Sequence, residues 1–338
     1  TILYASERNG SWDLYTTTIV RKEEPYFFNA TLLKEEALLS TPTEEFQPTY
    51  SPDGKEVAFL EERTSVRVVN IASKAVRTIV PANKNYSYAD GDQWYAWSPD
   101  SKWFLVEFLH DDQWITQCGL VSAEGGKEIL DLTRSGYGGY HPEWALDGKA
   151  VTFYSNRDGM KNHASWGGQM DAYAIFFTQE AYDKFKLNKE DFELAKEAED
   201  KKKEGDEEKK DDKDKKGDKD KDKKKEEDKK VEALKFDLAG IEDRKVRLTV
   251  NSSDLSSAIL SKDGEKLYYL TSFEKGYDLW QVELRTHEAK ILQKLGSGGA
   301  GGLTLDKEGT NLFFLNSGGI SKYDIEKSEM KGVGISGE

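Results

Sequence analysis

One turn phrase recurs along this chain at a nearly constant interval. "YSPDGKEVAFL" begins at Tyr50, "WSPDSKWFLVEF" at Trp97 and "WALDGKAVTFY" at Trp144, so successive copies lie 47 residues apart. The phrase returns as "LSKDGEKLYYL" from Leu260 and as "LTLDKEGTNLFFL" from Leu303. In each copy, turn-forming residues precede an apolar run of strand character. The pattern therefore predicts a chain built from repeated β units.

A second phrase follows the first in several repeats. "SERNGSWDLYTTTI", "SNRDG…MDAYAIFF" and "SFEKGYDLWQVEL" begin at Ser6, Ser155 and Ser272. They share a Ser, a charged turn ending in Gly, then an Asp, one small or apolar residue and an aromatic. Closing strands are expected in "GLVSAEGGKEILDLT" and "RKVRLTVNSS". Each unit therefore contains four strands.

Four-stranded units that repeat at this interval are typical of an all-β fold, the β-propeller. One small twisted sheet cannot bury both of its faces alone, whereas radial stacking buries them against neighbouring blades. The opening "ILYASERNGSWDLY" is expected to form a blade that lacks its first strand, which brings the number of blades to six. A seventh blade would need an N-terminal portion that this sequence does not contain.

A low-complexity insertion interrupts the repeat. From Lys196 to Lys230 nearly every residue is charged, with 16 Lys against 16 Asp and Glu. With no apolar residues to bury, such a run is expected to stay disordered. "FKLNKEDFELAKEAED" before it has helical spacing, with Asn188 as the N-cap. We therefore expect propeller blades 1–4 in residues 1–177, a helical segment and charged insertion in 178–230, and blades 5–6 of the same domain in 231–338.

Composition narrows the classes of partner. Because the insertion is electrically balanced, the net charge of −14 belongs to the folded part and argues against nucleic acid. A single cysteine, Cys118, excludes an intrachain disulfide. No apolar run approaches the length of a membrane span. The N-terminal "TILYASERNG" has no signal-peptide pattern and is expected to begin inside a strand, so we expect the chain to derive from a longer protein.

The repeats resemble a known family. "SPDGKEVAFL", followed by the Ser-x-Arg-x-Gly and Asp-Leu-Tyr patterns, is similar to TolB-type propeller repeats. "SYADGDQWYAWSPDSKWFLVEF" and "LSKDGEKLYYLTSFEKGYDLWQVELRT" resemble the propeller region of tricorn-type serine peptidases of Bacteroidetes. This resemblance spans the whole chain apart from the charged run.

The resemblance implies a non-catalytic propeller that guides or filters peptides or mediates contacts between domains or subunits. In that family the catalytic Ser and its helpers lie in downstream domains, and no position here matches their motifs. The implied partners are peptides or unfolded polypeptide, the PDZ and catalytic domains of the parent protein, and further copies in a homo-oligomer; no cofactor is implied. The family is usually exported, which indicates the periplasm, while the sequence itself leaves the cytoplasm open.

Two alternatives come from other functional classes. The first is a stand-alone TolB-like propeller that binds peptides or proteins, and the second is a propeller hydrolase with its site at the axial mouth. Many chemistries occur on propellers, so the fold does not decide between them.

The candidate binding segment is "SNRDGMKNHASWGGQMDAYAIFF". Compared with the first repeat, it carries a nine-residue extension, "MKNHASWGG", in the turn between two strands. Asp158, His163 and Ser165 are the residue types of an acyl-transfer triad, but a triad is usually assembled from distant segments. We interpret the extension as a binding loop for a peptide or a neighbouring domain, with the residues Arg157, Asp158, His163, Ser165 and Trp166.

Other polar motifs are interpreted as structural. "HDDQW", from His110, lacks a second His at ligand spacing, and "DGDQW", from Asp90, has neither the length nor the final Glu of a calcium loop. No metal site is therefore predicted. "GSGGAGG" is expected to be a flexible connection between blades. The Asp residues of the repeated turn should accept hydrogen bonds within their own turns, namely Asp53, Asp100, Asp147 and Asp263.

Overall fold

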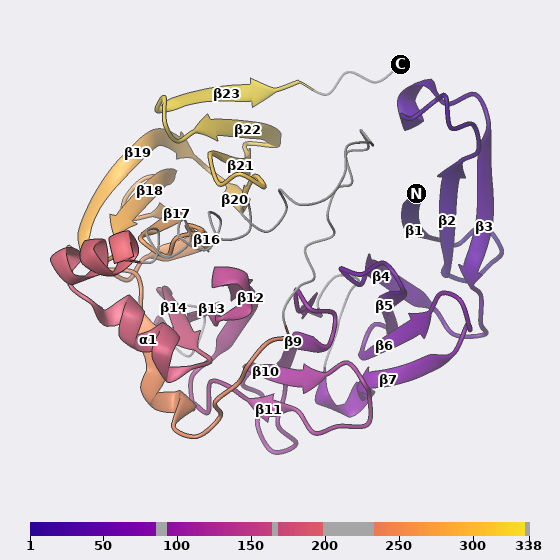
Figure 1. Ribbon diagram of the computed structural model, residues 1–338, viewed down its shortest axis with the longest axis horizontal. Coiled ribbons are helices and arrows are strands. Elements are labelled where there is room, and N and C mark those ends of the chain that lie inside the picture. The colour runs from indigo at the N-terminus through magenta and orange to yellow at the C-terminus, as the bar shows by residue number, and fades with distance from the viewer. Residues whose placement is uncertain (86–92, 164–167, 199–232, 335–338) are drawn as a thin grey trace, which may run out of the picture.

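Six antiparallel sheets arranged in a ring form the protein (Figure 1). The computed structural model describes residues 1–85, 93–163, 168–198 and 233–334. Five sheets have four strands, and the first has three, in the order β1-β2-β3. The all-β propeller with six blades is confirmed, and so is the first blade without its innermost strand.

The strands follow chain order from the axis outward in each blade. Blades 1 and 2 comprise β1 Ile2–Ser6, β2 Asp13–Ile19 and β3 Leu33–Leu39, then β4 Glu45–Tyr50, β5 Glu56–Glu61, β6 Ser65–Asn70 and β7 Val76–Val80. Blades 3 and 4 comprise β8 Tyr95–Trp97, β9 Trp103–Phe108, β10 Gln117–Ser122 and β11 Leu130–Asp131, then β12 Gly139–Ala145, β13 Ala150–Ser155, β14 Asp171–Phe176 and β15 Lys245–Arg247. Blades 5 and 6 comprise β16 Asp254–Leu260, β17 Lys266–Ser272, β18 Tyr277–Glu283 and β19 Glu288–Ser297, then β20 Ala300–Leu305, β21 Asn311–Asn316, β22 Gly319–Asp324 and β23 Glu329–Val333.

Hydrophobic side chains are buried between the blades. A strand presents alternate residues to opposite faces, so each sheet can contact a neighbour on both sides. Five clusters of buried apolar residues result, one for each pair of successive blades. Among the described residues, no such cluster, hydrogen bond or ion pair joins blade 6 to blade 1. In the part of the chain that the structure describes, five interfaces between successive blades therefore hold the ring together.

Hydrogen bonds between equivalent positions of successive blades reinforce these clusters. The Trp97 indole donates to the Thr49 carbonyl at 3.4 Å, and the Trp144 indole donates to the Ala96 carbonyl at 3.3 Å. Each pair is 48 residues apart in sequence, close to the length of one repeat. A Trp near the end of an inner strand thus serves twice as a link to the preceding blade.

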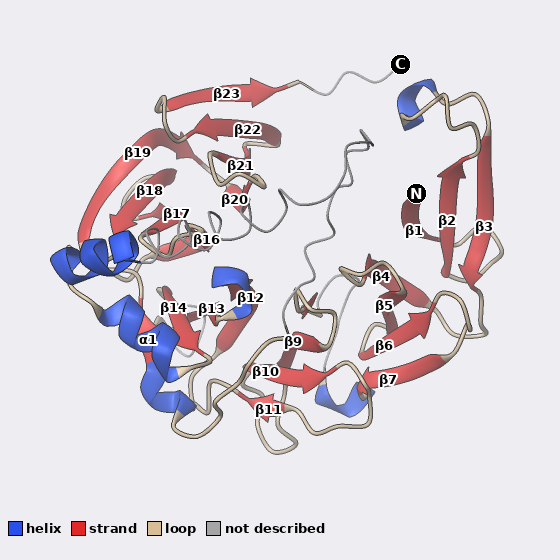
Figure 2. Cartoon of the chain, in the orientation of Figure 1, coloured by secondary structure: helices blue, strands red, loops and turns tan. Residues whose placement is uncertain are grey.

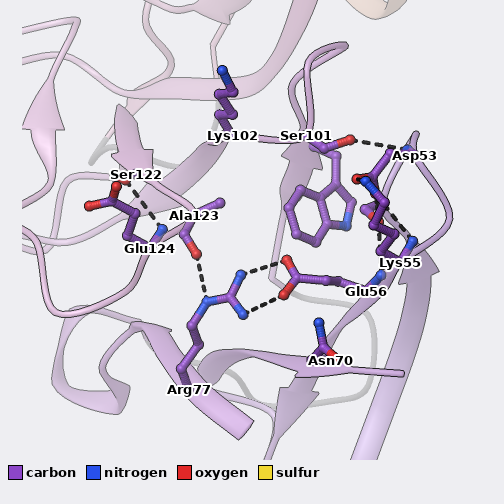
Figure 3. A network of polar contacts seen from close by, with 12 residues as sticks. Asp53, Lys55, Glu56, Asn70, Arg77, Ser101, Lys102, Ser122, Ala123 and Glu124 are labelled. Atoms are coloured by element: carbon purple, nitrogen blue, oxygen red, sulfur yellow. Dashed lines mark hydrogen bonds and ion pairs between the residues drawn. The ribbon is translucent and has the colours of Figure 1, made fainter. Parts of the chain in front are cut away.

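Figure 3 shows another link, between blades 2 and 3. Two nitrogens of Arg77, on β7, each contact a different carboxylate oxygen of Glu56 at 2.6 Å, and its Nε donates to the Ala123 carbonyl at 2.7 Å. Asp53 donates its backbone N–H to the Ser101 hydroxyl of the next blade at 3.1 Å. The hydrogen bonds from Arg77 lower the pKa of Glu56 below the usual value of a glutamate.

The repeated Asp-containing turn forms as predicted in three blades. In blade 2, the Ser51 hydroxyl donates to Asp53 at 2.7 Å, and the Lys55 N–H donates to the same oxygen at 3.1 Å. The Ser98–Asp100 and Ser261–Asp263 pairs repeat this arrangement.

The prediction is wrong for Asp147. This residue lies in the left-handed region, with φ 54°, inside the 3₁₀ turn Leu146–Gly148. The sequence there has Ala145 where the three turns described above have Ser, so the hydroxyl that donates to the Asp is missing. No hydrogen bond to the Asp147 side chain occurs within the described parts of the chain.

In blades 4 and 5, the Asp of the second phrase lies on the third strand and accepts hydrogen bonds from residues on or just after the fourth, outermost strand. Asp171, fully buried at the start of β14, accepts hydrogen bonds from Arg247 at 2.8 Å and from the Thr249 hydroxyl at 2.6 Å. In blade 5, Asp278 accepts the backbone N–H of Leu295 at 2.6 Å. In blades 4 and 5 the Asp of this phrase therefore makes a strand-to-strand contact within the blade, whereas Asp13 of blade 1 contacts Tyr15 on its own strand.

The insertion leaves blade 4 after β14 and returns as its outer strand β15. It begins with helix α1, Gln179–Lys186, and a second helix over residues 189–198 whose N-cap is Asn188, as predicted. Arg285 of blade 5 holds both helices: it donates to the Phe185 carbonyl at 3.0 Å and lies 3.7 Å from the Phe192 ring centroid. Figure 2 shows these helices on the outside of the ring. The predicted disordered run falls largely outside the described residues.

The "GSGGAGG" segment joins blades 5 and 6, as its composition predicts. However, its ends are strand residues, because β19 extends to Ser297 and β20 begins at Ala300. Short 3₁₀ turns complete the secondary structure, at Phe27–Asn29, Ala82–Lys84 and Ile241–Arg244 as well as in blade 4.

We expect Arg77→Met to lower the free energy of unfolding by about 1–3 kcal/mol, because it leaves the half-buried Glu56 carboxylate without its cation. Urea unfolding followed by fluorescence measures this change. Lys102→Met removes the same charge from an exposed position nearby and should change the stability by less than about 0.5 kcal/mol. Equal effects of the two substitutions would contradict the assigned link.

Candidate functional site

The two faces of the ring carry different loops. Because adjacent strands are antiparallel, the connections from second to third strands and those that lead into the next blade share one face, which we call the loop face. The Asp-containing turns and the helical insertion lie on the opposite side, the turn face. Leu234, near the end of the insertion, accordingly donates its N–H to Asp100 in a turn of blade 3 at 3.0 Å.

The predicted binding segment lies on the loop face of blade 4. Arg157 and Asp158 follow β13 directly, and Asp158 accepts a hydrogen bond from the Tyr173 hydroxyl at 2.5 Å. Burial and this contact raise the pKa of Tyr173. His163 is exposed and shows no hydrogen bond to Asp158 within the described chain, while Ser165 and Trp166 lie outside the described residues. The segment and the insertion belong to the same blade, but to opposite faces of it.

Arg157 lines a small, partly open recess between blades 3 and 4. Tyr137 and Gly138 enter it from the connection between the blades, and Lys245 from the start of β15. The remaining wall residues are Thr133, Ser135, Phe153, Ser155 and Tyr173. Burial, together with the nearby Arg157, lowers the pKa of the Lys245 ammonium. The recess thus brings two cationic groups together from segments separated by the insertion.

The inner strands carry strained bulges. The register of β12 against β13 shifts between Tyr140 and Glu143, and His141 within this bulge has φ 49°. A matching shift in β4 contains Gln47, at φ 47°. Left-handed conformations are costly for residues other than glycine and often occur at functional sites. Both residues precede a Pro on strands next to the axis, so the sequence carries a signal for these bulges in its His-Pro and Gln-Pro pairs.

Two carboxyl groups lie close to the His141 bulge. Glu107 accepts the backbone N–H of His141 at 2.7 Å, and the Trp94 ring meets the imidazole edge-on at 5.1 Å between centroids. Burial raises the pKa of Glu107 and of Glu143, each to about 7. Burial also lowers the pKa of His141. These carboxyl groups exchange protons near neutral pH, where most carboxyl groups are ionised.

The "HDDQW" motif does not form a cation site in the described structure. Of the "HDDQW" residues, His110 contacts Asp131 at 2.9 Å, while Asp111 contacts Lys84 at 2.6 Å, so neighbouring side chains point to different partners. Within the described residues, no three His, Cys, Asp or Glu side chains are grouped so that they could hold a metal ion. Most of "DGDQW" lies outside the described residues.

The fold is similar to those of two groups of solved structures. A tricorn protease matches 98% of this chain at a TM-score of 0.61 and 12% identity, and the chain covers 29% of that protein. A protein described as TolB from Agrobacterium tumefaciens matches 98% of the chain at a TM-score of 0.50 and 13% identity, and the chain covers 89% of it. No protein-family model and no curated protein matches the sequence.

These matches confirm the resemblance to tricorn and TolB propellers at the level of the fold. The chain spans less than a third of the tricorn protease that it matches. Among the described residues, no helix is long and apolar enough to cross a membrane.

We expect Glu143→Gln to make stability less dependent on pH. Between the usual carboxyl pKa of 4.5 and the raised value of about 7, the folded chain holds a proton that the unfolded chain has lost. Rising pH therefore favours unfolding, and the substitution should reduce the loss of unfolding free energy between pH 5 and pH 8 by about 1–2 kcal/mol. Urea titrations at both pH values test this, with Glu124→Gln, whose side chain is 76% exposed, as the control. If Glu143→Gln loses as much unfolding free energy between pH 5 and pH 8 as the unsubstituted chain, the Glu143 carboxyl group does not cause this pH dependence.

Proposed function

We propose that this chain is the non-catalytic propeller of a tricorn-type serine protease, which binds extended or unfolded polypeptide on its loop face and guides or filters it. Two observations support this proposal. The fold matches a propeller region of a tricorn protease over nearly the whole chain, and that protein is much longer than this chain. The loop face also carries exposed apolar side chains suited to peptide contact.

These side chains carry the proposal. They are Trp114, 77% exposed, Met160, 66%, Phe273, 42%, and Tyr137, 41%. They lie in connections of three successive blades, all on the loop face. Apolar and aromatic groups gathered on one face are typical of protein and peptide contact sites. Arg157 and Asp158 lie in the same region and complete the proposed contact surface, together with the predicted His163, Ser165 and Trp166.

A stand-alone TolB-like binding propeller is the second candidate, because the chain covers 89% of the length of one TolB protein. The genomic reading frame beyond Glu338 distinguishes the two. A PDZ-like segment followed by a serine-containing catalytic domain supports the protease, and a stop codon supports the stand-alone protein. For the protease, the proposed partners are its PDZ-like and catalytic domains. The proposed compartment is the periplasm.

We expect the double substitution Trp114→Ala and Met160→Ala to weaken binding of a labelled, permanently unfolded polypeptide at least fivefold, since exposed apolar anchors supply much of the binding energy in such contacts. Fluorescence anisotropy measures the affinity. Phe28→Ala is the control, because Phe28 is 88% exposed but lies between β2 and β3, on the turn face. Binding that is unaffected by the loop-face changes, or equally weakened by Phe28→Ala, would refute this binding surface.

A further inference from the structure

Two cationic side chains, Arg157 and Lys245, line the recess between blades 3 and 4, and no carboxylate of the described residues is in direct contact with either of them. The nearest carboxylates already have partners: Asp158 accepts from Tyr173 at 2.5 Å, and Asp131 contacts His110 at 2.9 Å. Glu242 lies 3.9 Å from Arg134. Arg157 and Lys245 form no ion pair within the described part of the chain. Burial lowers the pKa of Lys245, and Asp131, Asp158 and Glu242 lie near enough to act on this pKa in the raising direction, but none of them forms an ion pair with Lys245 or Arg157 in the described part of the chain.

A third cationic side chain, that of Lys161, lies beside the recess. Lys161 Nζ donates to the backbone carbonyls of Asn156 at 2.9 Å and Arg157 at 3.1 Å. The same nitrogen lies 4.9 Å from the centroid of the Tyr137 ring, which forms part of the recess wall. Its hydrogen-bond partners are neutral, so Arg157, Lys161 and Lys245 outnumber the two nearby carboxylates that are not paired with Arg or Lys, Asp131 and Asp158. The positive field is local, because the whole chain carries a net charge of −14.

The hydroxyl groups of the recess supply further donors. Ser155 Oγ accepts the N–H of Arg157 at 3.3 Å, and Ser135 Oγ accepts the N–H of Tyr137 at 3.1 Å. Within the described residues, neither hydroxyl donates its own hydrogen to an acceptor. The groups that remain for a ligand are thus two cations and two hydroxyl donors, a set that matches an oxyanion.

We propose that this recess binds an oxyanion the size of a carboxylate or phosphate group, held by Arg157 and Lys245 and by the hydroxyl groups of Ser135 and Ser155. The recess is small and partly open, so a larger ligand would lie over the loop face and insert only its anionic end. If the oxyanion is an acidic group of a bound polypeptide, this inference rests on the proposed function. The affinity of the recess for a small oxyanion does not depend on the proposed function.

The experiment uses inorganic phosphate as the probe, with isothermal titration calorimetry on the full chain at low ionic strength. We expect saturable binding that Lys245→Met and Arg157→Gln each weaken at least tenfold. Lys245→Arg keeps the charge and should retain binding within about threefold. Lys331→Met is the matched control, because it removes a lysine that is 77% exposed on blade 6. Circular dichroism verifies that each variant is folded.

Absence of phosphate binding to the unsubstituted chain would overturn the proposal, and so would binding that all variants share. The source of the oxyanion is distinguished with three peptides: one with acidic side chains and an amidated C-terminus, one neutral with a free C-terminus, and one neutral and amidated. Recess-dependent binding of either of the first two supports the proposal, whereas equal binding of the third contradicts it. Phosphate binding without any peptide binding would leave the recess proposal intact and contradict the proposed function. Peptide binding that Lys245→Met does not weaken, together with no phosphate binding, would refute the recess proposal and leave the proposed function intact.

Discussion

Contact between successive sheets is the interaction on which this structure depends. Each blade is a small sheet whose two faces are both largely apolar, so a blade alone would leave one or both faces exposed to water. Each of the five buried clusters covers the facing sides of two successive blades. Hydrogen bonds between blades, such as those of Trp97, Trp144 and Arg77, orient one sheet against the next. The nearly constant repeat length follows from this geometry, because equivalent residues must meet at every interface.

The recess is a product of the same stacking. Tyr137 belongs to the connection between two blades, Arg157 to a turn of blade 4, and Lys245 to a strand that arrives only after the insertion. Their positions are fixed by β13, β14 and β15 and by the buried contact of Asp171 with Arg247. A rigid sheet thus supports loops whose side chains need no regular structure of their own, as in many binding sites.

The sequence was sufficient for the fold, because the apolar runs and the Asp-containing turns repeat in step. The predicted hydrogen bond within the turn does not form at Asp147, because Ala145 stands there in place of the Ser whose hydroxyl donates to the Asp in blades 2, 3 and 5. For the candidate site, the position of Arg157 could be predicted from the extended loop. Its partner Lys245 could not, because no local signal reveals which residue after a long insertion returns to complete a blade. The raised pKa values of Glu107 and Glu143 also depend on burial between blades, which residue spacing alone does not specify.

Within the described residues, no buried cluster, hydrogen bond or ion pair joins the first and last blades, and this has a thermodynamic consequence. A closed ring gives every blade two neighbours, whereas here blades 1 and 6 each have one among the described residues. Such an arrangement behaves like a linear array, in which the terminal units open with a smaller free energy than the central ones. Backbone amides should therefore exchange with solvent fastest in the end blades and slowest in blades 3 and 4. The blades that carry the recess are thus the part of the ring where the cost of local opening is greatest.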